Sequence, residues 1–169
     1  MLSFFVMVAM LISGIATVSV CGSERYTLPV DSLSHHERRE TEFVEHVRSM
    51  VASRRFVFRP IIMQSVELGT TRDTYAYNFF FSLDGQHATV HLPFELVSMV
   101  IYTEEWDATT ADYSSTLVDG SYYRILFTIT REAKTWAFEI VVPLDTGEVQ
   151  MAIVTAEGTM RYIGSLEPM

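Results

Sequence analysis

The stretch 122–142, YYRILFTITREAKTWAFEIVV, decides the fold, because its apolar side chains recur at every second position. In each half, the alternate positions on one face are apolar: Tyr123, Ile125, Phe127 and Ile129, and then Trp136, Phe138, Ile140 and Val142. A period of two predicts β-strands that bury one face. Only a few residues separate the two halves, so neighbouring antiparallel strands are the economical arrangement.

The same period continues on both sides of this stretch. It predicts further strands at 55–63, 75–83, 87–92, 96–102, 148–156 and 159–166. Residue pairs typical of tight turns interrupt the pattern at Asp84-Gly85, Asp119-Gly120 and Glu157-Gly158. These turns favour an antiparallel meander, in which each strand pairs with the next.

The turn predicted at Asp84-Gly85 sets a register for the flanking strands. In that register Phe81 faces Ala88 and Phe79 faces Val90, so one face of the pair is apolar throughout. The segment 104–115, EEWDATTADYSS, is instead predicted to be an acidic loop.

A helix is predicted before the strands, at residues 32–55. Ser34 followed by Glu37 fits a capping box, and an apolar stripe recurs at helical spacing: Phe43, Val47, Met50 and Val51. We expect this stripe to pack on one face of the sheet or to plug one end of it. The predicted fold is therefore α+β and mainly β: an amphipathic helix and a curled antiparallel meander of eight or nine strands. Half-barrel or calycin-like curvature is expected, with a two-layer sandwich as the alternative.

Residues 1–22 are apolar and carry no charged side chain, and they end at the only cysteine, Cys21. Three outcomes fit: a lipoprotein signal with Cys21 acylated, an ordinary signal peptide cut after Gly22, or an uncleaved anchor. Each places the rest of the chain outside the cytoplasm, in the periplasm or at the outer membrane as a lipoprotein, or otherwise secreted. Residues 23–32 are then a tether, and residues 33–169 form a single domain.

Charge and motif content narrow the function. The net charge of −9 argues against nucleic acid as a partner, because phosphate binding needs clustered Lys and Arg. Membrane contact is expected only through the N-terminal lipid or anchor. The chain has no Gly-x-Ser-x-Gly elbow, and its histidines and acids lack the spacing of a metal site. We therefore expect no catalytic residues, no metal, no cofactor and no enzymatic activity.

Several segments resemble one uncharacterised family. They are RRFVFRPIIM, YNFFFSLDGQHATVHLPF, FTITREAKTWAFEIVVPLD and the closing MRYIGSLEP. In order and spacing they are similar to domain-of-unknown-function family four-two-five-one, whose members are secreted proteins and lipoproteins of Gram-negative bacteria. The similarity runs from about Val51 to Pro168. The family typically places a Gly soon after its Leu-Pro-aromatic step, where this chain has Glu95-Leu96. The resemblance implies localisation and fold, and it brings no activity.

Three functions remain open at this point. The first is a non-enzymatic protein-interaction or scaffold module whose partner is another envelope protein. The second is a carrier that holds a lipid or glycan inside the curved sheet, and the third is an unrecognised hydrolase. Trp106 and Phe80 are the candidate interaction residues, because one lies among acids and the other on an otherwise polar strand face. A sheet interior packed with large side chains would favour the first function over the second.

Overall fold

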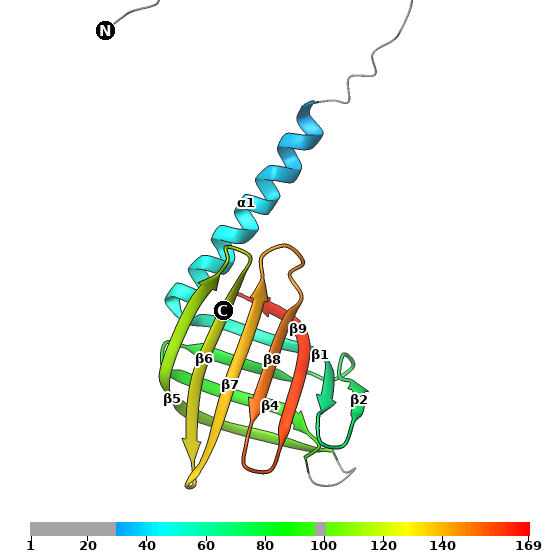
Figure 1. The fold of residues 1–169 in the computed structure, drawn as a ribbon, viewed down its shortest axis with the longest axis vertical. Helices are drawn as coiled ribbons and strands as arrows, with labels where there is room; N and C mark the ends of the chain where they lie inside the picture. The colour runs from blue at the N-terminus through cyan, green and yellow to red at the C-terminus, as the bar shows by residue number, and fades with distance from the viewer. Residues whose placement is uncertain (1–29, 97–100) are drawn as a thin grey trace, which may run out of the picture.

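The computed structural model describes residues 30–96 and 101–169, and side chains from residue 39 onward in its helix. Within these residues the chain forms one helix and nine strands (Figure 1). In chain order these are α1 (Val30–Ser53), β1 (Arg55–Ser65), β2 (Thr70–Asp73), β3 (Phe80–Asp84), β4 (His87–Phe94), β5 (Tyr102–Val118), β6 (Tyr122–Arg131), β7 (Lys134–Pro143), β8 (Val149–Val154) and β9 (Thr159–Glu167).

The nine strands form one antiparallel sheet that closes into a barrel. From β3 to β9 each strand pairs with the next, and β9 then pairs with β1 along most of its length. Strands β1 and β3–β9 make the closed wall, while the short β2 pairs only with the second half of β1. The predicted meander is confirmed, and its curvature goes beyond a half-barrel to full closure. The sandwich alternative is not what the chain adopts.

Close-packed side chains fill the interior of the barrel. The inward positions of the 122–142 stretch are buried as predicted except for the half-buried Tyr123, and Ile125, Ile129 and Ile140 are fully buried. At the centre Phe138 stacks on Phe127 with ring centroids 4.8 Å apart and packs on Phe81 at 5.4 Å. An interior packed in this way is as dense as an organic crystal and resists any change of side-chain volume.

The helix plugs the upper end of the barrel, as its apolar stripe predicted. Val47, Met50 and Val51 are buried within the main core, and the Tyr113 hydroxyl donates a hydrogen bond to the carbonyl oxygen of Val51. The N-terminal part of α1 projects away from the strands (Figure 1). Because α1 begins at Val30, Ser34 lies one turn inside the helix rather than at its N-cap. In the described residues, no helix is long and apolar enough to cross a membrane.

The predicted hairpin register is wrong by two residues. Leu83, rather than Phe81, pairs with Ala88, and Phe81 pairs with Val90. The reason is the turn, which uses Gly85 and Gln86 instead of Asp84 and Gly85: Gly85 has a φ of 65°, as the first loop position of a hairpin requires. An even shift keeps the same face inward, so the core survives the error. The strand also starts later than predicted, at Phe80, which leaves 75–79 outside it.

The predicted acidic loop is also wrong, because 104–115 lies within the long strand β5. Its acids do not prevent a strand, since Glu105 and Asp107 alternate with Trp106 and point to solvent while the indole points inward. A bulge at Asp112, with φ 55°, shifts the pairing with β6 between Ala111 and Ser114. The predicted strand at 96–102 falls largely on 97–100, which lie outside the described residues.

Candidate functional site: a groove on the outer face of the barrel

The structure separates the two candidate interaction residues. Trp106 lies inside the barrel and is 6% exposed, with its ring centroid 5.4 Å from that of Trp136. Its indole N–H is buried without a hydrogen-bond partner in the described part of the chain. Trp106 is thus a core residue with almost no surface to offer a partner. Cys21, the candidate lipidation site, lies outside the described residues.

Phe80 lies on the opposite, outer side of the wall and is half-buried. Its ring packs on His91 at 5.7 Å, and His91 in turn packs on Phe79 at 5.6 Å. Phe79 stacks on Tyr77, which is 65% exposed, and Tyr75 is 78% exposed. Phe80 is thus the shielded end of an aromatic row whose outer end is open to solvent.

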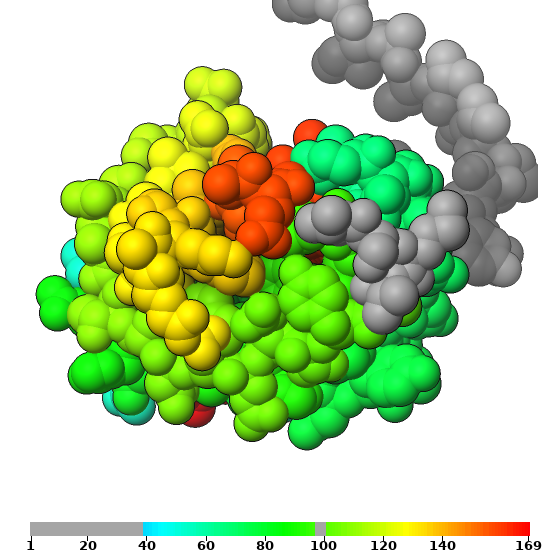
Figure 2. All heavy atoms as spheres, turned by 90° about the horizontal axis from the view of Figure 1, so that it is seen from below, coloured from blue at the N-terminus to red at the C-terminus, as the bar shows by residue number. Residues whose placement is uncertain are grey.

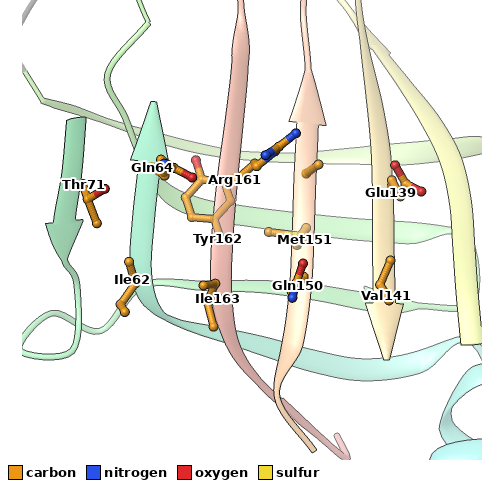
Figure 3. Close-up of a pocket in the computed structure, with 11 residues that line it drawn as sticks. Ile62, Gln64, Thr71, Glu139, Val141, Gln150, Met151, Arg161, Tyr162 and Ile163 are labelled. Carbon is orange, nitrogen blue, oxygen red and sulfur yellow. The ribbon is translucent and has the colours of Figure 1, made fainter. Parts of the chain in front are cut away.

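A hollow lies on the outer face of the barrel (Figure 3). Its volume is about 610 Å³, within the range of small-molecule and peptide sites. Strands β7, β8, β9 and β1 form its floor, and β2 stands at one side of it (Figure 3). The lining residues on the outer face are Ile62, Gln64, Thr71, Glu139, Val141, Gln150, Ala152, Arg161 and Ile163. We call this hollow the outer groove.

Strand register arranges the outer groove in two rows that cross the strands. The first row runs from β2 to β7 through Thr71, Gln64, Arg161, Ala152 and Glu139, each paired with the next. It holds both charges of the groove, and Ala152 between them is the only short apolar side chain.

The second row lies two residues away on each strand. From β1 to β7 its members are Ile62, Ile163, Gln150 and Val141. Three of these four side chains are apolar although they face outward. The groove therefore combines an apolar floor with a polar row along one side.

Only one of the two charges in the outer groove is neutralised within the protein. Glu139 accepts a hydrogen bond from Arg124 Nε at 2.6 Å, on the neighbouring strand β6. Arg161 makes no ion pair with any residue that the structure describes, and its side chain extends from β9 toward β8 (Figure 3). Counting Arg124 with Glu139, the groove carries a net charge of +1 in a chain of net charge −9.

The outer groove is not among the features predicted from the sequence, because those predictions concern the inward face of each strand and the groove lies on the other face. The sequence nevertheless contains a signal for it. The signal is a run of consecutive apolar residues, as in Ile61-Ile62-Met63 and Ile140-Val141-Val142. In a strand with one solvent-exposed face, apolar and polar residues alternate. Such apolar runs therefore indicate places where the outer face is apolar too.

A second hollow of about 290 Å³ lies at the lower end of the barrel. The β6–β7 and β8–β9 turns border it, and Figure 2 shows these turns close together when the barrel is seen from below. Its charged groups are Glu104, Lys134 and Glu157, and Lys134 Nζ donates to Glu157 at 2.7 Å. This hollow is smaller than the outer groove, and the cation in it is already paired.

Comparison with known proteins gives matches among the solved structures. No family model matches the chain, and no curated protein matches it. A crystal structure of a DUF4251 family protein from Bacteroides eggerthii DSM 20697 superimposes with a TM-score of 0.62, covering 76% of this chain and 89% of that one at 17% identity. The chain has the fold of a DUF4251 family protein. This confirms the resemblance to domain-of-unknown-function family four-two-five-one, at the level of the fold.

Within this DUF4251 fold, Glu95-Leu96 follows the Leu-Pro-aromatic step without a glycine. Neither Glu95 nor Leu96 has a positive φ angle, so the backbone there does not need one. The Glu95 side chain is fully buried and accepts hydrogen bonds from Thr70 Oγ1 at 2.7 Å and from Arg72 Nη2 at 3.1 Å. Glu95 thereby ties β2 to the end of β4.

We expect Glu95 to make the stability of the protein sensitive to acid. The hydrogen bond from Arg72, and then the one from Thr70, lower the pKa of Glu95 below its ordinary value. A lowered folded-state pKa stabilises the fold above the unfolded value of about 4.3, and this gain is lost as pH falls through the folded pKa. Glu95→Gln should therefore melt earlier than the wild type at pH 7, with the gap closing towards pH 3.

Thermal melts across that pH range check this expectation. Glu148→Gln is the matched control, because Glu148 is exposed. It should follow the wild type at every pH. A constant gap between wild type and Glu95→Gln at all pH values would show that the Glu95 charge contributes nothing.

Proposed function

We propose that this chain is an exported, non-enzymatic binding module that contacts its partner with the outer face of the barrel. The observation that carries the proposal is the contrast between the two faces. Aromatic and aliphatic side chains occupy the interior, while the outer groove offers about 610 Å³ beside an unpaired arginine. Export is supported by the apolar, uncharged segment 1–22.

The chemistry of the outer groove supports binding over catalysis. Its lining includes no His, Cys or Ser, and its carboxylate, Glu139, is held by Arg124. A general acid or base needs a titratable group aimed at the substrate, and a nucleophile needs a base beside it. A carrier that encloses its ligand within the sheet has less support, because the space it would use is filled by Phe81, Phe127 and Phe138.

Site-specific photocrosslinking tests the proposal in cells that express the full chain. A photoreactive phenylalanine analogue replaces Gln150, in the outer groove, or Leu117, which is 41% exposed near the far end of β5. We expect irradiation to give a discrete adduct from position 150 and none of that mass from position 117. Identical adduct patterns from both positions, or none from position 150, would refute binding through the groove.

A further inference from the structure

We propose that the outer groove binds an unbranched fatty carboxylate, with the carboxylate at Arg161 and the carbon chain over Ile163 and Ile62. The inference rests on the proposed function, since it assigns an occupant to the same groove. Three independent features carry it: the unpaired charge, the apolar row beside it, and the pairing of every strand in the floor.

The charge of the groove favours a monoanion. Among the lining residues Arg161 is the cation, and it has no ion pair within the described chain. The carboxylate of the groove, Glu139, is already paired with the nearby Arg124. A guanidinium holds a carboxylate through two parallel hydrogen bonds, and Gln64, its cross-strand partner, adds amide donors beside it. A dianionic phosphate would call for a second unpaired cation, which this groove does not supply. The negative charge of the rest of the chain is screened beyond about 8–10 Å at physiological salt.

The apolar row gives the carbon chain a path. Ile163 lies two residues from Arg161 on β9, and Ile62 is paired with it on β1. The Arg161 side chain extends toward β8 (Figure 3), where its cross-strand partner is the short Ala152. From Ala152 to Ile62 the path crosses two strand spacings and advances two residues, which is about 12 Å. A tail of roughly eight to ten carbons spans that distance, and each methylene that it buries favours binding.

The pairing of the floor argues for a hydrocarbon rather than a peptide. An extended peptide needs partners for its own backbone N–H and C=O groups, usually at a sheet edge. Strands β7, β8 and β9 are each paired on both sides, and so is β1 with β9, β2 and β3. The floor therefore presents side chains and no open ladder, and a hydrocarbon chain has no polar groups to leave unsatisfied.

Calorimetric titration of the full chain with decanoate tests the inference. The comparison ligands, titrated in the same way, are 1-decanol, butyrate and an apolar tetrapeptide with a free carboxylate. We expect decanoate to bind more tightly than the other three. Arg161→Gln should weaken the binding of decanoate about tenfold and leave the binding of decanol unchanged, because only the carboxylate accepts charge-assisted hydrogen bonds from the guanidinium and solvent exposure weakens these bonds. Arg55→Gln is the control, because it also removes one positive charge, from an arginine that pairs with Asp84 far from the groove. This variant should bind decanoate like the wild type.

Filling the groove gives a second, charge-neutral test. Ala152→Phe places a ring beside Arg161 and should abolish binding of both decanoate and decanol. Val154→Phe is its matched control, because Val154 is exposed on the same strand outside the groove. Thermal melts should show that the Arg161→Gln variant is as stable as the wild type, because the substitution breaks no ion pair. Any contribution of the N-terminal segment to binding is the same in all variants, so it does not affect their comparison.

The outcomes separate this inference from the proposed function. Equal affinity for decanoate and decanol, or no effect of Arg161→Gln, would overturn the role of Arg161. Tighter binding of the tetrapeptide would overturn the fatty carboxylate as occupant. A position-150 adduct from a protein that does not bind decanoate would leave the proposed function standing and reject this inference alone.

Discussion

Replacing Gly164 with Ala is expected to lower the melting temperature by about 10 °C or to prevent folding. An ideal Cβ at this position would lie 2.0 Å from the carbonyl oxygen of Arg59 and 2.9 Å from the Cα of Pro60. Both neighbours are backbone atoms, so no side-chain rotation relieves the clash. Overpacking usually lowers the free energy of unfolding by about 1–3 kcal/mol and occasionally by more. A contact this close with backbone atoms is expected to cost the upper part of that range or more. At about 2–4 °C per kcal/mol for a chain of this size, the melting temperature falls accordingly.

The position of Gly164 explains why the strands cannot move apart cheaply. It pairs with Pro60 on β1 and with Val149 on β8, beside the bulge between Pro60 and Ile62. The β1–β9 ladder is the one that closes the barrel, so separating these strands opens the wall. Ser165→Ala, on the next residue, is the control and should melt close to the wild type. Circular dichroism melts measure both variants, and a Gly164→Ala protein as stable as this control would contradict the close approach.

Truncating Phe138 to Ala is expected to cost about 3–5 kcal/mol of the free energy of unfolding, as for other large buried aromatics. The ring is 2% exposed, stacks on Phe127 and packs at a tilt against Phe81 at the centre of the barrel. Phe127 lies on the adjacent strand β6, and Phe81 lies on β3 at the opposite side of the closed wall. Hydrogen-bonded strands hold both rings in place, so they cannot collapse fully into the space that the substitution leaves. Urea denaturation measures the loss.

The same substitution at Phe43 provides the comparison. Phe43 is 38% exposed, and it lies on α1 near the β7–β8 turn. Phe43→Ala should cost clearly less, because much of this ring is already in water. If Phe138→Ala cost no more than Phe43→Ala, the interior would be loosely packed, and a ligand within the barrel would regain support over the outer groove.

Most of the fold could be predicted from the sequence because strand periodicity and turn residues act locally. The faces of β6 and β7 follow directly from alternation between residues 122 and 142, and Asp119-Gly120 lies in the predicted β5–β6 turn. Two errors also have local causes. The acids around Trp106 suggested a loop, yet alternation places them on the wet face of β5. One turn begins at Gly85 rather than at Asp84, which shifts a register by two.

The outer groove could not be predicted in the same way, because it depends on how distant strands align. Arg161 and Gln64 become neighbours only through the β1–β9 register, and Ala152 lies beside Arg161 only through β8–β9. Whether an arginine is paired is likewise decided by strands far apart in sequence: Arg124 meets Glu139 across β6–β7, and Arg161 meets no acid in the described chain. Side-chain type alone does not distinguish these two residues.

Closure between β1 and β9 has a consequence for how the chain matures. The first strand of the sheet finds its main partner only in the last one, so the wall cannot seal until nearly all strands are available. Contacts so far apart in sequence make folding slow. We propose that this protein is exported, and slow folding favours export because the chain remains unfolded while it crosses the membrane. The arrangement that makes the finished barrel hard to open would thus also give the nascent chain time to cross the membrane, if it is exported as we propose.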